Sequence, residues 1–313
     1  MTFKRRHLLS LEELDATEMM TILETSKVFR EVLDRPIKKV APLRGLTVAN
    51  LFFEPSTRTR VSFELAEKRL SADTVTFTAA TSSVKKGETL KDTVRNLEAM
   101  KIDMVVIRHS SSGVPYFLTR FCSSGVINAG DGQHEHPTQG LLDMYTMWMK
   151  YKKIKGLRVV LMGDAKHSRV MRSNIWGLTK LGASVAVCGP STLLPVGLEN
   201  MGVEVYTDID KALDGADVVN VMRIQLERQQ AGLLPSLREY TSLFGITKDR
   251  LKRLNKNYTI MHPGPINRGL EMADDIADCE QSVILEQVTN GVAVRMAVLY
   301  LLAGGEGRKT DED

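Results

Sequence analysis

The sequence predicts an α/β protein with two domains, each with a mostly parallel sheet flanked by helices. Short apolar runs rich in β-branched residues alternate with longer helix-like segments along the chain. This alternation implies right-handed crossovers between parallel strands. The 313 residues suffice for two domains of ordinary size. A lysine-rich stretch over residues 151–156 ends in glycine and suits a domain junction.

The first domain is expected over residues 1–150. Its strands are predicted at residues 46–53, 74–78, 104–107 and 126–129, and its helices at residues 57–70, 89–100 and 138–150. The first of these strands, LTVANLFF, is apolar enough to be buried. In parallel sheets ligands bind at the carboxyl ends of the strands, so residues that follow these strands are candidates for a site.

The second domain is expected over residues 151–282. Its strands are predicted at residues 157–162, 184–188, 217–222 and 258–261, with a helix at residues 169–181. Residues 223–245 mix charges with Gly232 and Pro235, which predicts a long loop that is functional or mobile.

The end of the chain is predicted to return to the first domain. Residues 283–302 form one long helical segment that is apolar nearly all round, so it must be buried. We therefore assign the C-terminal helix, residues 283–304, to the first domain. Residues 305–313 are almost all polar or glycine and are expected to be a disordered, solvated tail.

The composition is that of a soluble globular protein, with 43% hydrophobic and 26% charged residues. A net charge of +4 suits a protein that handles small anions and is too weak to indicate nucleic acid. The three cysteines lack metal-site spacing, which favours a reducing compartment. The absence of a signal-peptide pattern and of a long apolar run predicts no membrane segment and a cytoplasmic location.

A candidate phosphate site lies at residues 53–60, FEPSTRTR, between a strand and a helix. Ser56 is a candidate N-cap, and the amides that follow it are the unpaired donors of a helix N-terminus. Such a helix start binds anions, and an arginine fork in the same turn would match phosphate oxygens. The alternative is an ordinary capped helix with solvated arginines.

His136 is a second candidate, because it also lies at a predicted helix start. The positive helix end favours a neutral imidazole, which can donate a hydrogen bond to a carbonyl oxygen. A structural or solvated histidine is the alternative. His134 lies two residues earlier, but no matching set of carboxylates and histidines indicates a metal.

Arginines follow predicted strands in both domains: Arg108, Arg169 and Arg223, with Gln225 close behind. Each alone is typical of a surface charge, but together they indicate a cleft for a polyanion. The polar loop at residues 82–88 is by itself more typical of a solvated segment. Gly163 follows a strand without a G-x-G-x-x-G motif, so a nicotinamide oxidoreductase is only a weak alternative.

Two of these motifs resemble signatures of the aspartate and ornithine carbamoyltransferases. Residues 56–60 (STRTR), followed by VSFE, resemble the carbamoyl phosphate signature, and residues 136–139 (HPTQ) resemble the second one. The loop at residues 82–88 and the run MHPGPINRG at residues 261–269 resemble the aspartate branch of the family. The resemblance covers roughly residues 5–304. Gly264 departs from it, since many relatives have a bulkier apolar residue there.

The resemblance implies carbamoyl transfer from carbamoyl phosphate to L-aspartate, an early step of de novo pyrimidine biosynthesis, without a cofactor or metal. It also implies a carbamoyl phosphate domain, then an aspartate domain, in a homotrimer whose sites are shared between neighbouring chains. Further regulatory or dihydroorotase subunits are compatible with it. The phosphate ligands implied are Ser56, Thr57, Arg58 and Thr59, with Ser82 and Lys86 from a neighbouring chain.

The same resemblance implies the remaining roles. The carbonyl oxygen would be contacted by Arg108, Thr59 and His136, and the carbamoyl nitrogen by Gln139. The aspartate carboxylates would be held by Arg169, Arg223 and Gln225, and the carbamoyl group and amine by the backbone of Pro263 and Gly264. The expected catalytic residues are Arg58, Thr59, Lys86, Arg108 and His136.

Two alternatives remain open for the function. The acceptor could be another amine such as ornithine, although an arginine at position 223 with Gln225 suits a carboxylate better than a cationic side chain. The chain could also be a catalytically silent scaffold subunit, which predicts the loss of at least one site residue.

Overall fold

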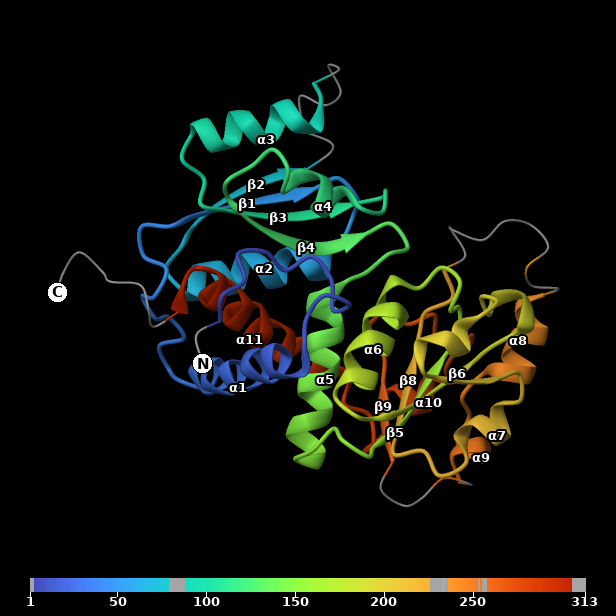
Figure 1. Cartoon of the computed structure of the whole chain (residues 1–313). Coiled ribbons are helices and arrows are strands. Elements are labelled where there is room, and N and C mark those ends of the chain that lie inside the picture. Colours follow the sequence, from blue (N-terminus) through green and yellow to red (C-terminus); the bar gives the residue numbers. More distant parts are fainter. Residues whose placement is uncertain are drawn as a thin grey trace. The chain divides into compact units, whose positions relative to one another are not determined.

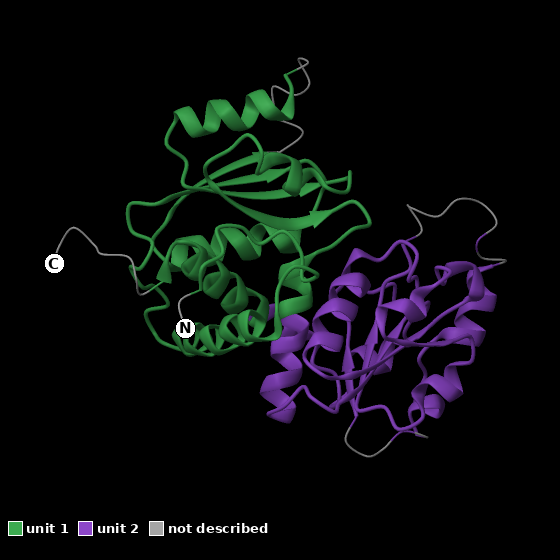
Figure 2. Cartoon of the chain, viewed as in Figure 1, with its two compact units in different colours: residues 1–141, 290–313 green, residues 142–289 purple. Residues whose placement is uncertain are grey.

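The computed structural model describes residues 3–78, 88–225, 233, 236–252, 254 and 258–305. The chain divides into two compact units: unit 1 is Met1–Leu141 with Asn290–Asp313, and unit 2 is Leu142–Thr289 (Figure 2). Both divisions fall inside helices, α5 (Pro137–Tyr151) and α11 (Ile284–Leu302). Among the described helices, none is both long and apolar enough to cross a membrane.

Unit 1 contains a four-stranded parallel sheet in the order β2-β1-β3-β4. Its strands are β1 (Thr47–Phe52), β2 (Asp73–Thr78), β3 (Met104–His109) and β4 (Gly125–Asp131). All four had been predicted, and β4 is longer at both ends than the predicted residues 126–129. The helices of the unit besides α5 and α11 are α1 (Ala16–Leu33), α2 (Thr57–Arg69), α3 (Leu90–Ala99) and α4 (Val114–Leu118).

The two faces of this sheet carry different helices (Figure 1). Leu51 and its neighbours on one face pack with Leu97 of α3 and Leu118 of α4 in an apolar cluster. Asn50, the next position of the alternating strand, is bonded instead to Glu67 of α2. Alternation along β1 thus places α2, with the candidate phosphate turn at its start, on the opposite face.

The predicted C-terminal helix is confirmed as α11, and it packs against the first domain as expected. The rings of Phe29 in α1 and Tyr300 in α11 meet edge to face with centroids 5.5 Å apart. Arg295, which is buried, donates from Nη1 to Ser62 Oγ of α2 at 3.0 Å. Its guanidinium carbon lies 5.1 Å from the ring centroid of Phe63.

Unit 2 contains a five-stranded parallel sheet in the order β7-β6-β5-β8-β9. Its strands are β5 (Arg158–Met162), β6 (Ser184–Cys188), β7 (Glu204–Tyr206), β8 (Val218–Val221) and β9 (Thr259–Met261). Its helices include α6 (Arg169–Lys180), α7 (Ile209–Leu213), α8 (Leu237–Phe244), α9 (Lys248–Leu251) and α10 (Asp274–Ala277). One face of the sheet buries an apolar cluster that takes side chains from α7, α8, α9 and α10.

The prediction of a loop over residues 223–245 was wrong at its end, where α8 forms. Ser236 caps this helix by accepting the Glu239 amide at 3.1 Å. Tyr240 and Phe244, four residues apart, stack with ring centroids 5.7 Å apart and are buried in the core. The residues between them are Thr241, Ser242 and Leu243, and the exposed Leu243 obscures the helical spacing of this buried pair in the sequence. The predicted tail lies outside the described residues beyond Gly305.

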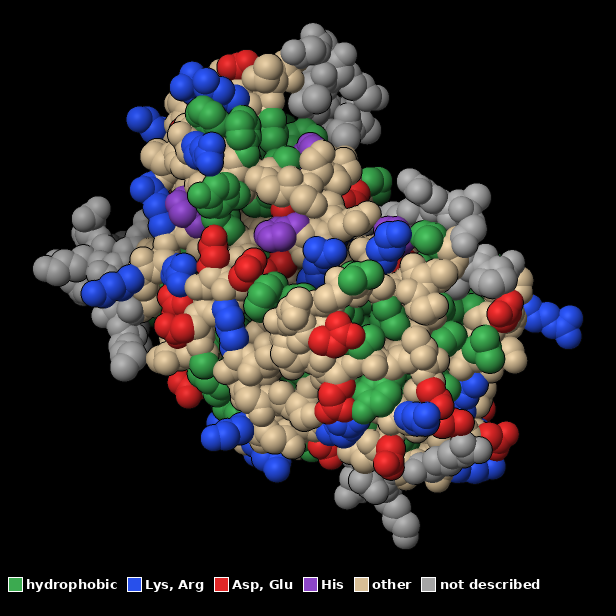
Figure 3. Space-filling model, turned by 45° about the vertical axis from the view of Figure 1, so that its right-hand side comes forward, with side chains coloured by type: hydrophobic (Ala, Val, Ile, Leu, Met, Phe, Trp, Pro, Cys, Tyr) green, Lys and Arg blue, Asp and Glu red, His purple; other side chains and the backbone are tan. Residues whose placement is uncertain are grey.

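Charges on the described part of the surface drawn in Figure 3 are interspersed, with basic and acidic side chains side by side. The net charge of +4 is therefore not gathered into one basic patch on that face. Evenly mixed charge of this kind is typical of an ordinary protein surface.

Candidate active site

The carboxyl edge of the unit 1 sheet brings three candidate segments together. Phe52 of β1 pairs with Arg108 of β3, and His109 pairs with Asp131 of β4. The Phe53 amide donates to the Arg108 carbonyl at 2.9 Å, which continues the ladder beyond β1. The turn before α2, the end of β3 and the loop before α5 therefore follow adjacent strands, as ligand sites of parallel sheets do.

The N-terminus of α2 carries the predicted phosphate residues. Thr57 and Arg58 are exposed and Thr59 is buried. Ser56 occupies the predicted N-cap position in an extended conformation, but its hydroxyl makes no capping hydrogen bond. The helix start thus presents its first backbone amides beside two hydroxyls and a guanidinium, a combination that binds tetrahedral anions.

Arg108 is held in a fixed orientation at this edge. Its Nη1 donates to the Ala129 carbonyl at 3.1 Å, and its Nη2 pairs with Glu54 Oε1 at 2.9 Å. Both side chains are largely buried, at 11% and 18% exposure, so the pair is little screened by solvent. Sequence reasoning missed Glu54, although its place inside the FEPSTRTR run was a usable signal.

His136 and Gln139 lie at the start of α5, and both are buried. The amides of Gln139 and Gly140 donate to the His136 carbonyl, at 2.9 and 3.2 Å. The preceding loop is fixed by Asp131, whose carboxylate accepts the Asn128 side-chain amide at 2.8 Å and the Glu135 backbone amide at 3.2 Å. The imidazole is therefore carried by an ordered turn.

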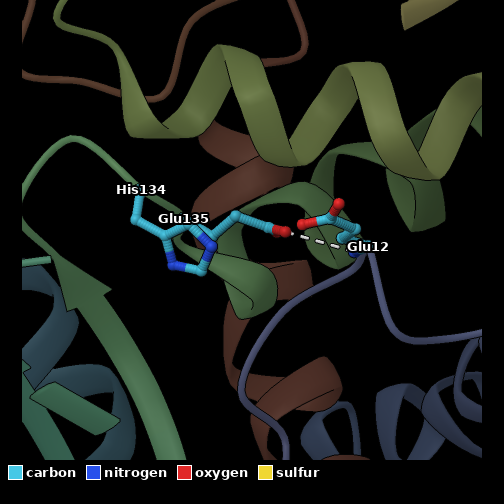
Figure 4. Close-up of side chains that lie close together, drawn as sticks. All are labelled: Glu12, His134 and Glu135. Atoms are coloured by element: carbon cyan, nitrogen blue, oxygen red, sulfur yellow. Dashed lines mark hydrogen bonds between the residues drawn. The ribbon is translucent and has the colours of Figure 1, made fainter. Parts of the chain in front are cut away.

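A group of possible metal ligands comes from this loop and from the N-terminal segment beside it (Figure 4). Ligand atoms of Glu12, His134 and Glu135 lie within 4.8 Å of one another. Glu135 is buried and accepts the amides of Leu11 at 2.8 Å and Glu12 at 3.1 Å. The hydrogen bond to Asp131 raises the pKa of His134 above its ordinary value. The hydrogen bonds of Glu135 therefore give the cluster a structural role: they attach the N-terminal segment to the loop.

A buried carboxyl lies at the opposite end of α2 from the phosphate turn. Glu67, near the end of α2, accepts from Asn50 Nδ2 of β1 at 2.8 Å, and both residues are fully buried. Burial raises the pKa of Glu67 from 4.5 to about 7, against the opposing hydrogen bond from Asn50. Glu64 raises this pKa slightly further, while Lys68 lowers it. Sequence reasoning gave no sign that this glutamate is buried.

The carboxyl edge of the unit 2 sheet brings together a second group. Met162 of β5 pairs with Val221 of β8, and Asn220 of β8 pairs with Met261 of β9. The Met222 amide continues this ladder by donating to the Met162 carbonyl at 2.7 Å. Arg169, Arg223 with Gln225, and Pro263 with Gly264 therefore follow three neighbouring strands.

Arg169 is the first residue of α6 and is buried. Ser168 caps this helix by accepting the Met171 amide at 3.1 Å. The loop before it is ordered by Asp164, whose carboxylate meets His167 Nδ1 at 2.9 Å and accepts the His167 amide at 3.1 Å. The buried Asp164–His167 pair was missed, although Asp164 follows a predicted strand directly.

Arg223 and Gln225 are both half-buried. Gln225 was expected to contact a substrate carboxylate, and in this structure its Nε2 donates to the His167 carbonyl at 3.2 Å. That bond joins the segment after β8 to the segment that leads into Arg169. The two arginine-bearing strand ends are therefore connected directly.

Pro263 and Gly264 follow β9 and are half-buried. Gly264 has φ +65°, a left-handed conformation that favours glycine. Its amide donates to His262 Nδ1 at 2.8 Å. This hydrogen bond holds the backbone of the turn in place although glycine has no side chain to pack. The remaining predicted ligands, Ser82 and Lys86, lie outside the described residues.

Family models match both halves of the chain. Residues 6–149 match the carbamoyl-P binding domain of aspartate/ornithine carbamoyltransferase, and residues 155–302 match the Asp/Orn binding domain. Together these matches cover most of the chain.

Relatives and solved structures agree with this result. The aspartate carbamoyltransferase catalytic subunit of Halothermothrix orenii is 58% identical over 313 residues, which is 100% of this chain and 99% of the relative. That of Gemmatimonas aurantiaca is 60% identical, over 98% and 96% of the two chains.

Among solved structures, ornithine carbamoyltransferase from Pyrococcus furiosus superposes with a TM-score of 0.86 at 33% identity, over 97% of this chain and 99% of that one. Aspartate transcarbamoylase from Trypanosoma cruzi, in complex with N-(phosphonacetyl)-L-aspartic acid, superposes with a TM-score of 0.85 at 28% identity, over 94% of each chain. The chain belongs to the aspartate/ornithine carbamoyltransferase family.

Proposed function

We propose that this chain is the catalytic chain of an aspartate carbamoyltransferase, which joins carbamoyl phosphate to L-aspartate and releases phosphate. One observation carries the choice of acceptor: relatives named aspartate carbamoyltransferase catalytic subunit match almost the entire chain at 58% and 60% identity. Two arginine-bearing strand ends in unit 2, joined by the bond from Gln225 to the His167 carbonyl, support a dicarboxylate acceptor.

The carbamoyl donor, carbamoyl phosphate, is assigned to unit 1. Residues 56–59 would bind the phosphate through the start of α2, where backbone amides, hydroxyls and Arg58 converge. Thr59, Arg108 and His136 would contact the carbamoyl oxygen, and Gln139 the carbamoyl nitrogen. The ion pair with Glu54 would fix the plane of the Arg108 guanidinium before substrate arrives.

The acceptor is assigned to unit 2. Arg169 and Arg223 would bind the two carboxylates of aspartate, with Gln225 assisting. The backbone of Pro263 and Gly264 would hold the carbamoyl group and the amine. A guanidinium presents a planar pair of donors, which suits a carboxylate better than the ammonium of ornithine.

The reaction is acyl transfer without a protein nucleophile. The neutral amine nitrogen attacks the carbamoyl carbon, negative charge grows on the carbamoyl oxygen, the bond to the phosphate oxygen breaks, and the amine loses a proton. Donors aimed at the carbamoyl oxygen stabilise this transition state, and the loss of one such donor typically costs about 100- to 1,000-fold in rate. Holding both substrates in register contributes roughly 7–11 kcal/mol more.

The proposal includes a cytoplasmic homotrimer acting in pyrimidine biosynthesis, with Ser82 and Lys86 of one chain completing the site of its neighbour. A mixing experiment tests the shared site. Hybrids of the inactive variants Lys86→Ala and Arg58→Ala should regain part of the activity, because some sites would contain neither substitution. Hybrids that stay inactive would contradict sharing between chains.

The reaction itself is tested by phosphate release from carbamoyl phosphate, with L-aspartate and L-ornithine compared as acceptors. Release that depends on aspartate, with carbamoyl-aspartate formed, is the expected result. Release with ornithine alone would overturn the acceptor assignment and keep the family. Release with neither acceptor would favour a silent scaffold subunit.

A further inference from the structure

A buried polar pair lies behind the turn that carries Pro263 and Gly264. The side chains of His262 and Glu271 are both 0% exposed, with His262 Nε2 3.3 Å from Glu271 Oε1. Burial of two polar side chains is costly unless hydrogen bonds replace the lost water. The bonds that this pair makes therefore indicate what it stabilises.

Those bonds go to the backbone of the turn. Gly264 donates its amide to His262 Nδ1 at 2.8 Å, so the ring proton is assigned to Nε2, which donates to Glu271. Glu271 Oε1 also accepts the Asn267 amide at 2.6 Å. The pair thus fixes the backbone at both ends of residues 264–267.

Asn267 extends the connection to the next strand end. Its Nδ2 donates to the Ile224 carbonyl at 3.2 Å, and Ile224 lies between Arg223 and Gln225 in the chain. The turn after β9 and the segment after β8 are therefore joined by one side chain.

The other side of the turn is anchored in the core of unit 2. The His262 amide donates to Gln287 Oε1 at 2.9 Å, and Gln287 Nε2 donates to Asp143 Oδ1 at 2.8 Å. Asp143 Oδ2 accepts from Asn174 Nδ2 at 2.8 Å. All of these residues are buried, and a buried network with such anchors moves little.

We propose that His262, Glu271 and Asn267 are positioning residues for the acceptor substrate. They hold the backbone at Pro263 and Gly264 in register with Arg223, so that the amine and the carboxylates of one small molecule meet their partners together. This inference rests on the proposed function and adds three residues to which the family resemblance assigned no role. Misplacement of a site group by about 1 Å can cost roughly 100-fold, so such positioning has a measurable effect.

Asn267→Ala is the first test, with Asn200→Ala, at an exposed position of the short 3-10 helix Leu198–Met201 in the same unit, as the matched control. Loss of the bond to Ile224 should raise the KM for aspartate about tenfold, while the KM for carbamoyl phosphate stays within about twofold. Asn200→Ala should change neither constant. A purely structural role for Asn267 would lower the melting temperature and leave both KM values unchanged.

Glu271 offers a second and sharper pair of variants. In Glu271→Gln the amide oxygen can still accept from His262 and Asn267, and its nitrogen replaces Oε2, which has no hydrogen-bond partner among the described residues. Glu271→Leu removes both bonds. We expect the aspartate KM to rise about tenfold or more in the leucine variant and to return close to the wild-type value in the glutamine variant.

Outcomes separate the inference from the proposed function. An aspartate KM that is unchanged in Asn267→Ala, or that rises no more than the carbamoyl phosphate KM, overturns the positioning role while wild-type activity upholds the reaction. A wild-type protein without aspartate-dependent release overturns the proposed function instead. If Glu271→Leu fails to fold, Asn267→Ala and its control Asn200→Ala still decide the question.

Discussion

The two groups of candidate residues are built in different ways. In unit 1 the phosphate residues are consecutive, at residues 56–59, and the helix that begins there sets their spacing. In unit 2 the acceptor residues come from three strand ends, and side chains such as Gln225 and Asn267 join those ends through backbone carbonyls.

Because of this difference, single substitutions should affect the two groups in different ways. A site on one helical turn keeps its internal geometry as long as the helix forms, so single substitutions there should act mainly on the chemistry. A site assembled from separate loops depends on the hydrogen bonds that join those loops. Substitutions that remove such a bond should therefore weaken acceptor binding even where the residue does not touch the substrate. Arg58→Ala and Arg223→Ala test this contrast directly, and variants of Glu67 and Ser62 test the stability of α2, which carries the first group. They follow in order of decreasing expected effect.

Arg58→Ala should abolish most turnover, because it removes a charged donor from the phosphate turn. We expect a loss of about 100- to 1,000-fold in kcat with an unchanged melting temperature, since Arg58 is exposed. Arg69→Ala, at the opposite end of the same helix, is the matched control and should retain activity. Near-normal turnover in Arg58→Ala would contradict the assignment of Arg58 as a phosphate ligand.

Glu67 should make unit 1 less stable as the pH rises. Its pKa is raised from 4.5 to about 7 in the folded protein, so the stabilisation is complete below about pH 4.5 and is lost as the pH rises through 7. The difference corresponds to about 3 kcal/mol. Glu67→Gln should flatten the dependence of the melting temperature on pH between 4.5 and 7. Parallel curves for wild type and variant would contradict the raised pKa.

Arg223→Ala should act on one substrate. Loss of a charge-assisted bond to a carboxylate should raise the aspartate KM about 10- to 100-fold and leave the carbamoyl phosphate KM nearly unchanged. Steady-state kinetics with each substrate varied in turn measures both constants. Equal increases in the two would argue against separate donor and acceptor groups.

Ser62→Ala should have the smallest effect, on stability alone. It removes the bond from Arg295 Nη1 of α11, at 3.0 Å, and should cost about 1–2 kcal/mol. A lower melting temperature with both KM values unchanged is the expected result, because the phosphate turn lies one turn earlier on the helix. A selective rise in the carbamoyl phosphate KM would mean that α11 also positions the turn.

Much of the fold was predictable, because its signals are local. Buried parallel strands are continuous apolar runs, so β1, β3, β5 and β6 were recognised with small errors at their ends. Strand β7 and the helices α1, α4, α7, α8, α9 and α10 were missed, although α1 begins with a capping box formed by Asp15 and Glu18. In α8 only Tyr240 and Phe244, four apart, are buried, whereas Leu237 and Leu243 are exposed, so the sequence shows no clear apolar face.

The sequence by itself determined the order of the recognised strands and helices, the strand ends at which polar residues cluster, and the consecutive residues of the phosphate turn. Each of these depends on neighbours within a few positions of the chain. Only the tertiary structure decided which carboxylates are buried and which side chains bridge the loops: Glu54 with Arg108, Glu67 with Asn50, and Glu271 with His262. The sequence records a glutamate in the same way whether it lies at the surface or in the core. Its burial and its hydrogen-bond partners depend on residues distant in the chain, and only packing brings those together.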